Sequence, residues 1–241
     1  MNDRVRAVVR KEFREYRRNR FIVLTMAAMP VVVLLVLVGE TFALPDRIPF
    51  ASLRRPVGEA LLFLQLIPVM LPTTIAAYAI IGEREQGTLE PVLSTAVTDR
   101  ELLAGKAVAA ALPAVAISWA LFAVYVALAN AFAPDVVVSR IWTPEQAVAM
   151  GVMTPALAGF SILLGMLISL RATDFRVAQQ LAVLASLPVI GLVALVTFRV
   201  IDPSAGLYVG TAALIALLAL VCWRLAIRLF NRERLLTRFG D

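Results

Sequence analysis

The chain has 241 residues, of which 61% are hydrophobic, and carries a formal net charge of +6. Together with a mean hydropathy of +0.85, this composition lies far outside the range of soluble globular domains and indicates an integral membrane protein. The sequence contains no histidine and a single cysteine, Cys222, which excludes histidine-based catalysis, a histidine-ligated metal and a disulfide framework.

Residues 4–20 combine many cations with a helical apolar pattern. Eight Lys or Arg residues stand here against two glutamates, and the apolar residues recur at helical spacing: Val5, Val8, Val9, Phe13 and Tyr16. The pattern predicts an amphipathic interfacial helix, with its apolar face in the headgroup boundary and its cations against anionic lipid. A secretory signal peptide is the rival interpretation. It fails because the apolar run that follows is long enough to span a membrane and no small-residue cleavage site comes after it.

Six apolar segments are long enough to cross a hydrocarbon core of roughly 30 Å, which needs about 20 helical residues. They cover residues 21–39, 60–81, 106–132, 147–170, 177–198 and 204–226. Start signals precede the last three spans: Thr143-Pro144 with Gln146, then Thr173 or Asp174, then Asp202-Pro203. Five of the six spans contain proline, at Pro30, Pro68 with Pro72, Pro113, Pro155 and Pro188. Neighbouring helices can satisfy the freed carbonyls, so these prolines predict kinks rather than helix ends.

The longest polar interruption, residues 82–106, separates the second span from the third. Glu83, Arg84 and Glu85 directly follow an apolar run and should lie where the second span leaves the bilayer. Gly87 permits a sharp turn, and Thr88 is a candidate N-cap for a short helix over residues 89–95. Thr98 and Glu101 have the spacing of a capping box, which would start the next helix.

This segment resembles the ABC-2 family of ABC transporter membrane subunits. The matching residues are Glu83, Arg84, Glu85, Gly87, Thr88, Leu89, Glu90, Leu93, Thr95, Arg100, Leu103, Gly105 and Lys106. The resemblance implies that the short helix is a cytoplasmic coupling helix that docks on a separate ATPase, with the residues from Glu83 to Thr95 as the coupling residues. The sequence departs from the family pattern at Ala96, where the family usually has proline. The alternative is a solvated interfacial loop without a partner.

Other stretches extend the resemblance over nearly the whole chain. Residues 169–180 are similar to the inner loop before the fifth span of ABC-2 subunits, and residues 229–236 to their tail, although a generic cationic anchor would also explain the tail. In the family the second span lines the transport pathway, which makes its polar and proline residues candidates: Gln65, Pro68, Pro72, Thr73, Thr74 and Tyr78. Hydrogen bonds between helices are the alternative explanation for these polar residues.

Small residues recur at every fourth position of the fourth span, at Ser161, Gly165 and Ser169. Such spacing lets helices approach closely. Packing within the subunit is preferred over a dimer contact as the explanation.

The distribution of cations predicts the orientation. Eighteen of the 23 Lys and Arg residues lie in the N-terminal segment, the 82–106 and 171–176 loops and the tail, whereas five lie in the opposite connections. Both termini and the Glu85 loop should therefore face the cytoplasm of a cell membrane. Without an internal repeat or a low-complexity linker, residues 1–241 are expected to form one transmembrane domain.

The leading hypothesis is a permease subunit of an ATP-driven exporter. The Gly105-Lys106 pair lacks the rest of a P-loop, because Arg100 stands where the first glycine should be, so the chain cannot bind ATP by the usual motif. The resemblance implies that a separate ABC ATPase hydrolyses ATP. Permease subunits would pair as homodimers or heterodimers, and neither a cofactor, a metal nor a nucleic-acid partner is expected.

Functions of other classes have less support. A stand-alone secondary transporter or channel is disfavoured because the spans contain no Asp or Glu. An intramembrane enzyme is disfavoured for the same reason and because histidine is absent. A non-catalytic assembly factor has no positive indication. The apolar character of the spans favours an amphipathic or hydrophobic cargo over a small hydrophilic one.

Overall fold

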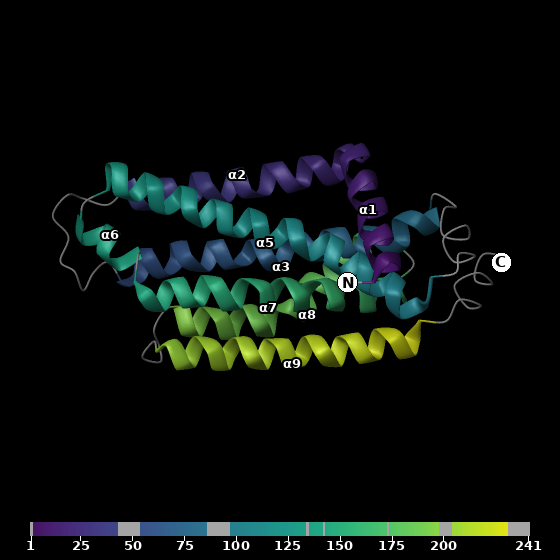
Figure 1. The fold of residues 1–241 in the computed structure, drawn as a ribbon. Helices are drawn as coiled ribbons and strands as arrows, with labels where there is room; N and C mark the ends of the chain where they lie inside the picture. Colours follow the sequence, from purple (N-terminus) through teal and green to yellow (C-terminus); the bar gives the residue numbers. More distant parts are fainter. Residues whose placement is uncertain are drawn as a thin grey trace.

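The computed structural model describes residues 2–42, 54–85, 97–133, 135–141, 143–172, 174–197 and 204–230. Over these residues the regular structure is entirely helical: α1 (Asp3–Arg18), α2 (Arg20–Phe42), α3 (Arg54–Glu85), α5 (Asp99–Phe132), α6 (Asp135–Ile141), α7 (Pro144–Ser169), α8 (Phe175–Thr197) and α9 (Ala205–Leu229). The long helices run side by side as a bundle, α1 crosses one end of it, and the short α6 lies at the other end (Figure 1). The predicted all-α fold is confirmed, and α6 is an element that the sequence analysis missed.

Five of the described helices are long and apolar enough to cross a membrane, namely α2, α5, α7, α8 and α9. In α3 the described apolar stretch is shorter, Leu61–Ala76. The outward faces of the bundle carry large exposed apolar side chains, such as Leu24, Leu35 and Leu184. In water these faces would be costly, whereas in lipid they are the expected surface. The chain is therefore a multi-pass membrane protein, and the sixth span remains a prediction.

Most of the predicted helix starts are confirmed by their caps. Thr143 accepts a hydrogen bond from the backbone N–H of Gln146 over 3.3 Å at the start of α7, and Asp174 accepts from Arg176 N at 2.6 Å at the start of α8. The prediction for the last helix was wrong by two residues. Ser204 is its cap, accepting from Leu207 N at 3.1 Å, because a serine hydroxyl directly before the first turn can bond the free N–H groups there.

The prolines lie inside helices, as predicted, rather than at helix ends. Five helices each contain at least one, at Pro30, Pro68 with Pro72, Pro113, Pro155 and Pro188. A proline inside a helix removes one backbone hydrogen bond, and packing against other helices compensates for that loss. The bundle keeps α2, α3, α5, α7 and α8 continuous through these positions.

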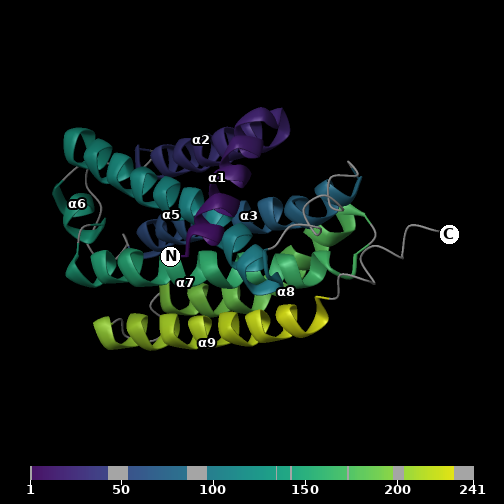
Figure 2. The ribbon, with the colours of Figure 1, turned by 45° about the vertical axis from the view of Figure 1, so that its right-hand side comes forward.

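Helix α3 is the central element of the bundle. It packs against α2, α5, α7 and α8, and no side chain between residues 61 and 76 is exposed. In Figures 1 and 2, α3 lies between α5 on one side and α7 on the other. Its 32 residues extend about 48 Å at the helical rise of about 1.5 Å per residue.

The small residues of α7 serve this packing. A Cβ added to Gly165 would lie 2.9 Å from the Cβ of Ala76 and 3.4 Å from the Cα of Thr73, both on α3. Ser161 and Ser169 are completely buried. Close approach of α3 and α7 within one subunit, the preferred explanation of the small-residue spacing, is therefore confirmed.

Candidate functional site

One end of the bundle brings together α1, the last turn of α3 and the first turns of α5 (Figures 1 and 2). The α3 backbone stays helical through Glu83, Arg84 and Glu85, so these three residues form its last turn. The other predicted coupling residues, Gly87, Thr88, Leu89, Glu90, Leu93 and Thr95, lie outside the described residues, as do Ala96 and the predicted coupling helix itself. The described part of the site is consequently the pair of helices that flank this segment, α3 and α5, and the helix α1, which packs on α5.

The start of α5 carries the predicted capping box. Thr98 Oγ1 accepts a hydrogen bond from the backbone N–H of Glu101 at 3.3 Å, and Thr98 N donates to Glu101 Oε2 at 3.0 Å. The same carboxylate reaches α1, because Asn2 Nδ2 donates to Glu101 Oε1 at 2.7 Å and an Arg4 nitrogen lies 3.6 Å from Oε2. Glu101 therefore fixes the first turn of α5 and joins it to the beginning of α1.

The apolar face of α1 packs against protein. Val8, Val9 and Tyr16 are buried in the main core cluster, and α1 contacts α5 more extensively than it contacts α2. The amphipathic pattern predicted for this segment is confirmed, but the prediction that its apolar face inserts into the headgroup boundary was wrong for these three side chains. The physical reason is that α5 begins several residues before its apolar span and so offers α1 an apolar surface of its own.

Gly105 allows α1 to lie close to α5. A Cβ at this position would be 2.5 Å from Cγ1 and 2.6 Å from Cβ of Val8, distances that real atoms do not adopt. The valine is β-branched and stiff, so it could not move aside alone. The glycine of the Gly105-Lys106 pair is thus explained by the contact between α1 and α5.

Lys106 forms a buried ion pair with Glu12 of α1. Its Nζ donates to Glu12 Oε1 at 2.7 Å, and both side chains are only 2% exposed. Lys11 Nζ also lies 3.5 Å from Glu12 Oε1 and 3.1 Å from Glu15 Oε1. A buried pair is costly to break, because removing one partner leaves the other charge uncompensated. The pair therefore fixes the position of α1 along α5.

Sequence analysis missed Glu12 as a functional residue, although an indication was available. Glu12 falls on the same helical stripe as Val5, Val8, Val9 and Tyr16. A carboxylate on the apolar stripe of a helix needs a buried cation, and Lys106 stands at the start of the third apolar span. Only the fold shows that these residues meet.

The arginines of α1 are exposed. Arg10, Arg14, Arg17 and Arg18, with Phe13, surround a surface cavity of about 460 Å³. The four guanidinium groups give α1 an electropositive outer face, which agrees with the prediction that these cations meet anionic lipid.

The candidate pathway residues of α3 are buried between helices. Gln65 Nε2 lies 3.1 Å from the sulfur of Met150 on α7, and Gln179 Nε2 of α8 donates to Thr74 Oγ1 at 2.9 Å. Thr73 donates to the carbonyl of Met70 in its own helix at 2.8 Å. Pro68 and Pro72 are buried, and the side chain of Tyr78 lies outside the described part. Contacts between helices thus exist for Gln65 and Thr74, while the pathway role stays a prediction.

Three buried polar atoms on α3 and α7 have no hydrogen-bond partner within the described protein: Gln65 Oε1, Thr154 Oγ1 and Ser161 Oγ. A buried polar group without a partner costs about 1 to 3 kcal/mol. Helices α3 and α7 therefore carry buried polar groups whose desolvation is not compensated within the described protein. Sequence analysis did not identify Thr154.

Among the described residues, no group of three or more His, Cys, Asp or Glu could hold a metal ion.

Comparison with known protein families gives a match. The model of the family described as ABC-2 type transporter matches residues 3–194, which include α1, the last turn of α3 and the start of α5. A comparison with curated proteins found no match. The match covers well over half of the chain, and the chain therefore belongs to the ABC-2 type transporter family, whose membrane permeases are typically non-catalytic and work with a partner ABC ATPase.

Proposed function

We propose that the chain is the permease subunit of an ATP-driven exporter and is coupled to its ATPase through residues 83–95. The observation that carries the proposal is the rigid junction between α1 and α5, made by the Glu12–Lys106 pair, the Val8–Gly105 contact and the Asn2–Glu101 hydrogen bond. A coupling segment needs rigid bodies on both sides if a displacement is to be passed on. Here the segment follows the central helix α3 and precedes the start of α5.

A displacement of this segment would move two bodies. On one side, α5 and α1 would move together, because separating them would expose the buried Glu12 and Lys106 charges. On the other side, α3 would transmit the motion to the centre of the bundle, where the unpartnered Gln65, Thr154 and Ser161 atoms lie. The contact between α3 and α7 is therefore the proposed site of the conformational change.

The proposal includes six spans with both termini cytoplasmic. The length of α3, about 48 Å, exceeds the roughly 30 Å of a hydrocarbon core. Contacts of Gln65 with Met150 and of Gly165 with Ala76 mean that α3 and α7 run in the same direction. The second and fourth spans of an alternating six-span chain also run in the same direction, so this observation supports the proposed topology.

The proposed cargo is amphipathic or hydrophobic, such as a lipid-like molecule, a drug or an apolar peptide. A small hydrophilic solute needs a path lined with groups that replace its hydration. The core of the bundle consists mainly of Leu, Ile, Val and Ala, and most of the buried polar side chains among the described residues are those of Ser and Thr. Two permease subunits would form the pathway between them, with the polar residues of α3 as the candidate lining.

The test is reconstitution of the permease in liposomes with and without a candidate ABC ATPase from the same organism. We expect ATP-dependent transport only with the ATPase, and stimulation of ATP hydrolysis by amphipathic compounds. Glu85→Ala and Gly87→Val should both reduce transport while leaving membrane insertion intact. The first removes one member of a proposed charge pair at the interface, a loss that costs about 2 to 5 kcal/mol. The second places a β-branched residue at the proposed turn, where glycine permits conformations that valine does not. Transport without any ATPase would favour a secondary transporter, and normal transport by both variants would exclude a coupling role for these positions.

A further inference from the structure

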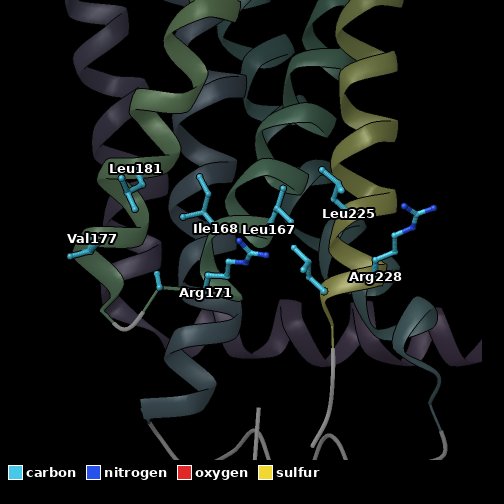
Figure 3. Close-up of a pocket in the computed structure, with 9 residues that line it drawn as sticks. Leu167, Ile168, Arg171, Val177, Leu181, Leu225 and Arg228 are labelled. Atoms are coloured by element: carbon cyan, nitrogen blue, oxygen red, sulfur yellow. The ribbon is translucent and has the colours of Figure 1, made fainter. Parts of the chain in front are cut away.

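A groove opens on the surface of the bundle where α7 ends, α8 begins and α9 ends (Figure 3). Helices α8 and α9 both pack on α7 but have little contact with each other. The space between them is a cavity of about 740 Å³. Leu167 and Ile168 of α7 form its floor, α8 contributes Val177 and Leu181, and α9 contributes Leu225.

The groove is apolar along its length and cationic at the end where the helices stop. Leu181 is 47% exposed and Leu225 41% exposed, so both walls face outward. Arg171, directly after α7, and Arg228, in the last turn of α9, complete the lining, and no acidic residue contributes to it among the described residues. Figure 3 shows Arg171 directed into the space between the walls, whereas the Arg228 side chain extends outward from α9.

This arrangement matches the chemistry of an anionic phospholipid. An acyl chain is complementary to a leucine-lined channel beside a membrane-spanning helix, and a phosphodiester at the level of the helix ends would meet the Arg171 guanidinium, with the Arg228 charge close by on α9. Hydrogen bonds from arginine to phosphate are charge-assisted and can be bidentate, and basic pockets between membrane helices are known to bind lipid headgroups. We propose that the groove between α7, α8 and α9 is a binding site for one anionic phospholipid.

A second copy of the chain fits the groove less well. A symmetric contact would place each groove against its own copy, so that four guanidinium groups would meet without carboxylates between them. The nearest acidic residue in sequence, Asp174, already accepts hydrogen bonds from the backbone N–H groups of Arg176 and Val177. A phospholipid supplies the missing negative charge.

The experiment measures lipid retention on the purified permease alone, so its result is independent of the ATPase and of transport. The permease is exchanged into mixed micelles with phosphatidylglycerol or phosphatidylcholine of identical acyl chains, and bound lipids are counted by native mass spectrometry. R171Q/R228Q is compared with R176Q/R224Q, which removes the same charge at exposed positions that do not line the groove. R171K/R228K keeps the charges as a further variant.

We expect the wild type to retain phosphatidylglycerol at least about tenfold better than phosphatidylcholine. R176Q/R224Q and R171K/R228K should keep this preference, and R171Q/R228Q should lose it. A photoreactive phosphatidylglycerol should cross-link to the segments that contain Leu181 and Leu225. Equal losses in the two glutamine variants, or no headgroup preference in the wild type, would overturn the proposal. So would a change in oligomeric mass of R171Q/R228Q with lipid retention unchanged, which would identify the groove as a contact between subunits.

Discussion

Among single residues, Glu12 and Lys106 have the most specific role in the described structure. Each is almost fully buried, and each is the other's nearest opposite charge at 2.7 Å. In water an ion pair contributes little, but in a buried position the loss of one partner is severe. The loss of stability should therefore be large when one of the two charges is removed and small when both are removed together.

Replacing Lys106 by Met should lower the thermal midpoint of the purified permease by about 10 °C, because about 3 to 5 kcal/mol is lost when a buried charge is left alone. Glu12→Leu combined with Lys106→Met should restore most of the loss, since an apolar pair of similar volume avoids the cost of burying charge. The measurement is size-exclusion chromatography after heating, with fluorescence detection.

The control for this pair is Glu15→Gln, which removes the more exposed partner of Lys11. Its midpoint should change little, because exposed pairs contribute about 0 to 1 kcal/mol. If Lys106→Met were as stable as Glu15→Gln, the buried pair would have no role in holding α1.

At the scale of elements, α1 is fixed to α5 by shape as well as by charge. Gly105→Ala would force a Cβ against Val8, so we expect α1 to be displaced from α5 while the spans remain folded. Hydrogen exchange in α1 should rise, and transport with the ATPase should fall. Gly151→Ala is the matched control, since nothing lies within 4 Å of a Cβ at Gly151. Unchanged exchange in α1 of the Gly105→Ala variant would contradict this account.

The elements that could be predicted from sequence are those governed by local chemistry. Capping residues such as Thr98 and Thr143 are recognisable because their hydrogen bonds go to N–H groups a few residues away. Hydropathy located the long helices because the bilayer sets the length of a continuous apolar segment. The short α6 was missed because its seven residues are too few for a periodic pattern to emerge.

The contacts between distant elements could not be predicted. Nothing in the sequence near Glu12 indicates which cation it meets, since Lys106 is 94 residues away. The same holds for the side of α1 that faces protein, because an apolar stripe fits lipid and a neighbouring helix equally well. The groove between α7, α8 and α9 likewise depends on how three helices pack, and not on any local pattern.

At the scale of the whole molecule, the proposed topology rests on the uneven distribution of cations and on the parallel course of α3 and α7. Single cysteines at Ser94 and Ser52, introduced with Cys222→Ala, test it in intact cells. We expect an impermeant thiol reagent added outside to label position 52 and not position 94. Labelling of position 94 from outside would reverse the orientation and would remove the coupling segment from the side of the ATPase.

The central position of α3 has a consequence for the order of synthesis. In the proposed topology the helix enters the membrane before α7 and α8 have been translated, yet Gln65 contacts Met150 of α7 and Thr74 contacts Gln179 of α8. Until those helices arrive, the Gln65 and Thr74 side chains lack these partners, and unpartnered polar groups are unfavourable in lipid. A nascent chain truncated after Phe132 should therefore be degraded faster in a pulse-chase experiment than one truncated after Thr197. The first half of the protein would thus depend on the second half to survive its own biogenesis.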